Sequence, residues 1–87
     1  MYIKPIGKID INTAAEFGTT TNDLLDDIKE LVLDFAEITY ISSIGLRVLL
    51  ELQKRMNQQG VMTITNVAPE VMEIFKMTGF SNILTIA

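Results

Sequence analysis

Short apolar segments alternate along this chain with segments of helical periodicity, and this alternation restricts the fold more than any other feature. Three segments have the character of strands: Met1–Ile11, Leu31–Phe35 and Val61–Thr65. Leu31–Phe35 is short, apolar and β-prone, which is typical of a strand buried on both faces. The order of strand, helix, strand, helix, strand, helix predicts βαβ crossovers and a mainly parallel sheet that helices cover unevenly.

The first helix is expected between the first two of these segments. A capping box at Thr13–Glu16 marks its start, because a threonine and a glutamate three residues later can each bond a free backbone N–H group there. Its apolar face repeats at steps of three and four residues, at Ala14, Phe17, Thr21, Leu24 and Ile28. Four acidic residues are expected on the solvated face of the same helix, namely Asp23, Asp26, Asp27 and Glu30.

The second helix is expected to run from Ser42 or Ser43 to about Gln59. Either serine is a candidate N-cap, and Gly60 is a suitable stop. Ile44 heads a stripe that is otherwise polar, namely Arg47, Glu51, Lys54 and Gln58. The side chains expected to face inward are Val48, Leu49, Leu52 and Met56. Ile44 is therefore expected beside Ser43, either partly covered or as an apolar contact for a partner.

Prolines and glycines delimit the remaining segments. Pro69 stands where a proline favours the first turn of a third helix, and Gly79 is its expected end. Pro5 cannot donate a hydrogen bond to a neighbouring strand, which predicts an edge strand or a bulge near it. The apolar tail Ile83–Ile86 is expected to form a last strand or a packed end.

The composition excludes several classes of function. The chain has 87 residues, enough for one domain, and contains neither histidine nor cysteine. The commonest general base, the commonest metal ligand and any thiol nucleophile are therefore missing. The net charge of -4 argues against a nucleic-acid partner, and no apolar run approaches the roughly 20 residues of a membrane span. We expect a soluble protein of the cytoplasm, with no cofactor, no metal and no enzymatic activity.

The junction Tyr40–Leu46, between a strand and the second helix, is the best candidate for a functional site in the sequence. Backbone N–H groups at a helix start lack partners and carry partial positive charge. A serine hydroxyl there can cap the helix, and the same groups can hold a phosphate. No glycine-rich phosphate loop and no G-x-S-x-G motif occurs in the chain. Ser43 is thus either a helix cap or a phosphorylation site, and the local pattern leaves both open.

Three blocks of the sequence together resemble the STAS domain family, in its bacterial anti-sigma factor antagonist type. Gly7–Ala14 resembles the G-x-L-D-x-x-T-A segment of that family. Leu31–Asp34 followed by Ile38–Leu46 resembles its buried strand and D-S-[ST]-G-L motif. Asn66–Gly79 is similar to its N-x-x-P-x-V-x-x-[IL]-[FL]-x-x-[ST]-G region. The resemblance implies an α/β fold with a small, mainly parallel or mixed sheet and helices packed mainly on one side. It also implies a single domain over residues 1–87 that lacks the family's first strand and last helix.

The resemblance further implies that the protein binds an anti-sigma factor, which is also a serine kinase, and so releases a sigma factor. Ser43 matches the serine that such a kinase phosphorylates, and Asp10 matches an aspartate close to it in space. The residues expected to contact the partner are Asp10, Asn12, Ser42, Ser43, Ile44, Arg47 and Glu51.

Two positions of the Ile38–Leu46 block depart from the family's D-S-[ST]-G-L motif. Ser42 occupies the place of an aspartate, and Ile44 that of a second hydroxyl residue. They leave open a constitutive interaction or scaffold module without a phospho-switch. A small enzyme or ligand binder that uses Ser43 and Asp10 is a further alternative, and it would need a deep apolar pocket beside them.

Overall fold

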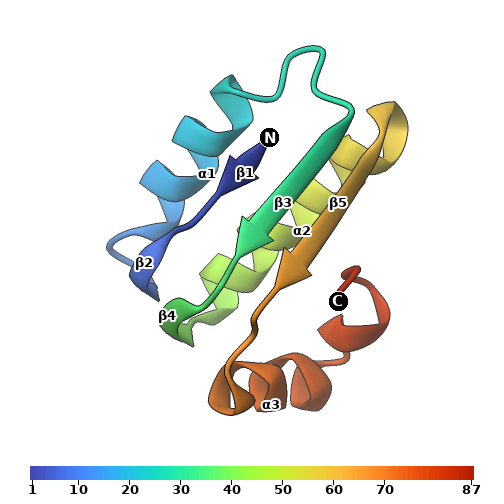
Figure 1. Cartoon of the computed structure of the whole chain (residues 1–87). Coiled ribbons are helices and arrows are strands. Elements are labelled where there is room, and N and C mark those ends of the chain that lie inside the picture. Colours follow the sequence, from blue (N-terminus) through green and yellow to red (C-terminus); the bar gives the residue numbers. More distant parts are fainter.

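Every strand pairing in the structure is parallel, as the alternation of strands and helices predicts (Figure 1). The computed structural model describes all residues, 1–87. Its elements are β1 (Tyr2–Ile3), β2 (Ile6–Ile9), α1 (Ala14–Asp23), β3 (Glu30–Asp34), β4 (Glu37–Ile41), α2 (Ser43–Gln59), β5 (Val61–Thr65), α3 (Pro69–Thr78) and a 3₁₀ turn (Phe80–Asn82). The strands form one sheet in the order β1-β3-β5 and a second sheet in which β2 pairs with β4. The α/β class expected from the sequence is confirmed.

The chain passes between the two sheets twice, once from β1 to β2 and once from β3 to β4. An ion pair joins the first passage to the start of β4, with Lys4 Nζ 3.3 Å from Glu37 Oε2. Pro5 lies in the first passage, between two strands that each form the edge of a sheet. The pairing of β2 with β4 changes register between Gly7 and Lys8, as at a β-bulge. The edge position and the bulge predicted from Pro5 are therefore both present.

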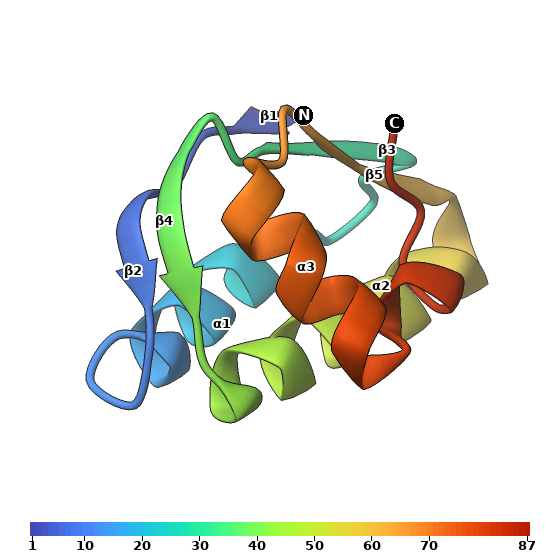
Figure 2. The same ribbon diagram turned by 90° about the horizontal axis from the view of Figure 1, so that it is seen from below.

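The helices lie on one side of the β1-β3-β5 sheet, as expected (Figure 2). The side chains of the sheet that face them are fully or nearly fully buried, namely Leu31, Leu33, Met62 and Ile64. Phe35 and Phe75 complete this core with ring centroids 6.4 Å apart. The opposite face of the sheet carries no helix, and Tyr2 and Val61 are exposed there. None of the helices combines the length and the apolar character needed to cross a membrane.

The first helix is shorter than the periodicity predicts. It ends at Asp23, so Ile28 lies outside it, and Leu25 is buried instead of the exposed Leu24. Of the four acids assigned to one helical face, only Asp23 is on α1. Asp26 and Asp27 lie in the connection, where Asp27 has φ of 63°, and Glu30 begins β3.

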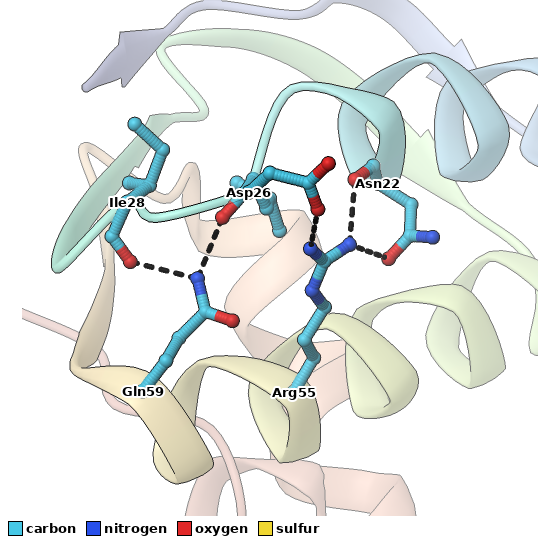
Figure 3. Close-up of polar contacts among 6 residues, drawn as sticks. Asn22, Asp26, Ile28, Arg55 and Gln59 are labelled. Atoms are coloured by element: carbon cyan, nitrogen blue, oxygen red, sulfur yellow. Dashed lines mark hydrogen bonds and ion pairs between the residues drawn. The ribbon is translucent and has the colours of Figure 1, made fainter.

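The connection from α1 to β3 is held by two side chains of α2 (Figure 3). Arg55 donates to the backbone and side-chain oxygens of Asn22 at 2.6 and 2.7 Å, and it pairs with Asp26 at 2.7 Å. Gln59 Nε2 donates to the carbonyl oxygens of Leu25 and Ile28 at 2.6 and 2.7 Å. In a longer helix the Asn22 carbonyl group would accept from the Asp26 N–H group. Here Arg55 bonds it instead, which favours the early end of α1, and Gln59 satisfies carbonyl groups of the connection.

The predicted capping box is also wrong. The Thr13 hydroxyl makes no bond to the start of α1. It accepts from the Asp10 N–H group at 2.9 Å and donates to the Lys8 carbonyl oxygen at 2.7 Å. The preceding turn therefore uses the hydroxyl that the motif assigned to the helix.

Five strands form where the sequence predicts three, because Met1–Ile11 divides at Lys4 and Pro5 into β1 and β2, and Glu37–Ile41 forms β4 opposite β2. The ends of the other two helices and the tail follow their sequence signals closely. Helix α2 ends before Gly60, and α3 runs from Pro69 to Thr78 with Gly79, which has φ of 81°, as its C-cap. The tail is a packed end with a single β-bridge, because Leu84 is buried and Ile86 pairs with Ile64.

Candidate functional site

Pairing of β2 with β4 brings together the two segments that carry the predicted site. Ile9 is opposite Ile41, and the Ser42 N–H group donates to the Ile9 carbonyl oxygen at 2.9 Å. Figure 2 shows both strands ending at the same edge, where the turn to α1 and the start of α2 lie side by side. Asp10 and Ser42 thus directly follow paired residues on neighbouring strands.

Gly45 allows α2 to begin in contact with the end of β2. It is buried in the first turn of α2, and a Cβ atom built on it would lie 2.8 Å from the Ile9 carbonyl oxygen. The same atom would be 2.8 Å from Cγ1 of Ile41. Gly45 therefore positions the site without belonging to its surface. A glycine in a first helical turn is the signal that could have identified it.

The two adjacent serines have different roles. The Ser42 Oγ atom accepts from the Gly45 N–H group at 3.2 Å, and Ser42 has the extended backbone of an N-cap. Ser43 is the first residue of α2 and is exposed. The interpretation of Ser43 as the helix cap is therefore wrong, because Ser42 fills that position. Ser43 thus opens the helix at the surface, at one of the two starts that the sequence predicts.

The turn after β2 is built around Asp10, which is half-buried. Its Oδ1 atom accepts from the Asn12 N–H group at 2.9 Å and lies 3.3 Å from Oγ1 of Thr13, whose single proton is donated to the nearer Lys8 carbonyl oxygen. Its carbonyl oxygen accepts from the N–H groups of Thr13 and Ala14 at 3.1 and 2.8 Å. One carboxylate oxygen of Asp10 thus shapes the turn that leads into α1. Asn12 is exposed at the tip of that turn.

An open hollow of about 390 Å³ lies between this turn and the first turn of α2. We call it the Ser43 hollow, and it is lined by Ile11, Ser42, Ser43, Ile44 and Arg47. Ile44 is 42% exposed and Ile11 is 77% exposed, so two apolar side chains meet solvent beside the serine. The structure gathers four of the predicted partner-binding residues here and adds Ile11. Ile11 escaped the sequence analysis because it lies in a turn, where no strand or helix period assigns it a side.

Glu51 is exposed one turn beyond Arg47, on the same stripe of α2. It lines a different, mostly polar groove between α1 and α2, together with Asn22 and Asp23. The predicted stripe of α2 is exposed as expected, and Leu49, Leu52 and Met56 are buried, whereas Val48 is only half-buried. Glu51 is therefore a neighbour of the Ser43 hollow and not part of its wall.

A second polar cluster lies away from the hollow, at the end of β3. The buried Asp34 carboxylate accepts hydrogen bonds from the Tyr2 phenol, the Ala36 N–H group at 2.9 Å and the Asn66 amide at 3.1 Å. These bonds, that of Tyr2 first, hold the pKa of Asp34 below its ordinary value, and the same contact raises the pKa of Tyr2. Asn66 has φ of 56°, a left-handed conformation that asparagine tolerates better than most residues.

The lowered pKa of Asp34 predicts a specific dependence of stability on pH. The folded protein binds this proton less readily than the unfolded chain, so the stabilisation is complete above the ordinary carboxyl pKa of 3.8 and is lost as the pH falls below it. Urea unfolding between about pH 5 and pH 2 should show a shallower acid dependence for Asp34→Asn than for the native chain. The exposed Asp23→Asn is the control for net charge. An equal acid dependence in the native chain and Asp34→Asn would contradict the prediction.

The STAS domain model matches residues 1–87, and the chain therefore belongs to the STAS domain family. BtrV of Bordetella bronchiseptica, provisionally named an anti-sigma factor antagonist, is 40% identical over 60 residues, which are 68% of this chain and 52% of BtrV. The chain thus spans about half the length of this curated relative.

Solved structures of anti-sigma factor antagonists have the same fold. A protein from Thermotoga maritima, provisionally described as one, matches with a TM-score of 0.90 and 19% identity over 98% of this chain and 75% of its own. Unphosphorylated SpoIIAA matches with a TM-score of 0.81 and 16% identity over 99% of this chain and 77% of its own. SpoIIAA from Bacillus has also been solved in its phosphorylated form, with a TM-score of 0.72 and 15% identity over 99% of this chain and 80% of its own. The fold is therefore that of the STAS domain, as the sequence predicts.

Proposed function

We propose that this protein is an anti-sigma factor antagonist, which binds an anti-sigma factor through the surface around Ser43. The observation that carries the proposal is an exposed serine, free of the capping role, beside an open hollow with apolar walls. The family and the names of its similar members support the same role. In this proposal the chain is a cytoplasmic regulatory binding protein and not an enzyme, and its binding releases a sigma factor.

The proposed contact surface combines the Ser43 hollow with its rim. Ile11 and Ile44 supply the apolar area, which is the part that gains most from losing water. Asp10 and Asn12 border it on the β2–α1 turn, and Glu51 lies beyond Arg47 on α2. An apolar centre with a polar border is the usual anatomy of a protein interface.

Phosphorylation of Ser43 by the partner is the proposed control of this binding. The Ser43 Oγ–P bond forms as the bond from the bridging oxygen to the γ-phosphorus of ATP breaks. ADP leaves, and the hydroxyl proton passes to a base of the kinase. The phosphate adds about 1.5 to 2 negative charges. At the exposed helix start this charge should cost the fold little or favour it by about 0.3–1 kcal/mol. In a closed interface the desolvation of an unpaired dianion costs several kcal/mol, and about 1.4 kcal/mol is already tenfold in affinity.

A constitutive interaction module is the second candidate function. The observation in its favour is the neighbourhood of Ser43, which has Ser42 and Ile44 where the family pattern has an acid and a hydroxyl residue. Ser42 nevertheless performs the capping that an aspartate would perform at that position. Incubation with the kinase-type anti-sigma factor of the same cell, followed by mass spectrometry of Ser43, separates the two candidates. A bound but unmodified protein would favour the constitutive module.

Substitutions at the two serines test the proposed control. Ser43→Asp should keep the fold and weaken binding of the anti-sigma factor at least tenfold, whereas Ser43→Ala should bind normally and resist phosphorylation. Ser42→Ala should instead lower the free energy of unfolding by about 0.5–2 kcal/mol, because it removes the cap. Calorimetric titrations and urea unfolding measure both effects. Equal affinities of the Ser43→Asp and Ser43→Ala variants would leave the constitutive module as the better description.

A further inference from the structure

Arg47 lies one helical turn after Ser43, and both residues line the Ser43 hollow. Residues four apart on a helix are neighbours on its surface, about 5–6 Å apart at their Cβ atoms. Arg47 is exposed and takes part in neither ion pair of the chain, which join Lys4 to Glu37 and Arg55 to Asp26. Its guanidinium group is therefore available to an anion at Ser43.

The other charged residues of the proposed contact surface are acidic, namely Asp10 on the β2–α1 turn and Glu51 one turn after Arg47 on α2. Of these three charges, only that of Arg47 attracts an anion on Ser43. Arg47 is also the sole cation among the residues proposed to contact the partner.

We propose that a phosphate on Ser43 is bound by Arg47 within the same helix. Phosphorylation then changes the binding surface twice, because it adds a dianion and also withdraws the one cation of that surface from the partner. A guanidinium group suits this role, since its forked N–H groups can donate two parallel bonds to phosphate oxygens. The inference rests on the proposed function and adds the residue through which the modification acts.

The experiment measures the phosphate itself and requires neither kinase nor partner. Phosphoserine is incorporated at position 43 of the full chain during synthesis, and the phosphate is titrated by phosphorus NMR. Its second pKa is about 6 in the absence of neighbours. A bound guanidinium favours the dianion, so this pKa should be higher by about 0.5 in Arg47→Gln than in the phosphorylated protein with Arg47. Arg47→Lys should give an intermediate value, because an ammonium group keeps the charge and loses the fork.

Lys54→Gln is the matched control. It removes the same charge from the same exposed stripe of α2, but seven residues further along the helix. Screening by salt should leave its effect on the phosphate small. Equal changes in the phosphate pKa for Arg47→Gln and Lys54→Gln would overturn the inference and would leave the proposed binding function standing. Unchanged partner affinity for Ser43→Asp would instead count against the proposed function, without altering this titration.

Discussion

Replacement of Gly45 by alanine is expected to lower the free energy of unfolding by about 1–3 kcal/mol, although alanine ordinarily stabilises a helix. The new methyl group would lie 2.8 Å from the backbone carbonyl oxygen of Ile9 and 2.8 Å from Cγ1 of Ile41. A backbone carbonyl bound into a sheet cannot move aside as a side-chain end can, and this one already accepts from Ser42. Relief of the contact must therefore separate α2 from β2. Urea unfolding measures the loss.

Gly18→Ala is the control for this substitution. It also places a methyl group in a helix, and that group would lie 3.0 Å from a side-chain methyl of Val48. A half-buried valine can shift by a few tenths of an ångström, so the gain in helix propensity, at most about 1 kcal/mol, should roughly offset the contact. Partner affinity should fall for Gly45→Ala even among folded molecules, since the turn and the helix start move apart. Equal stability of the two variants would show that the contact at Gly45 is unimportant.

Leu49→Ala is expected to lower the free energy of unfolding by about 2–5 kcal/mol, through lost burial and the cavity it leaves. Leu49 is 0% exposed on the inner face of α2. Ile44→Glu should cost much less stability, because Ile44 is 42% exposed at the head of the polar stripe. Affinity for the anti-sigma factor, corrected for the fraction of folded protein, should fall more for Ile44→Glu than for Leu49→Ala. A carboxylate at position 44 would stand in the apolar part of the proposed interface.

Thermal unfolding and binding titrations on both variants test this pair of effects. If Ile44→Glu unfolds as readily as Leu49→Ala, Ile44 belongs to the core and the proposed contact surface is misplaced. Ile11→Glu offers a second test of the same surface, since Ile11 is outside the periodic elements and 77% exposed. It should weaken binding without a comparable loss of stability.

Sequence patterns predicted best those elements whose ends have strong local signals. Helix α2 runs from Ser43 to Gln59 because a serine cap precedes it and Gly60 follows it, and both signals act within a few residues. The start of α3 at Pro69 has the same explanation. Strand β5 was predicted with its observed bounds, since it lies between two such ends.

Predictions failed where contacts distant in sequence decided the outcome. Periodicity could not show that Arg55 and Gln59 would bind the connection after α1 and end that helix early. It could not choose between Ser42 and Ser43 as the cap, because either hydroxyl can reach the free N–H groups. The close approach at Gly45 and the position of Ile11 depend on the pairing of β2 with β4. Local sequence therefore identifies the polar residues of the site and Ile44, while the contribution of Ile11 requires the fold.

The free edge along β1 and β2 has a consequence for the behaviour of the protein at high concentration. Unpaired strand edges can template pairing between molecules, which leads to aggregation. Here the edge is interrupted by Pro5, which lacks a donor, and by the register shift between Gly7 and Lys8. Lys8 adds a positive charge along it that takes part in neither ion pair of the chain, so two copies placed edge to edge would bring like charges together. Such an edge is poorly suited to start a fibril, and a Pro5→Val, Lys8→Val double variant should lose that protection.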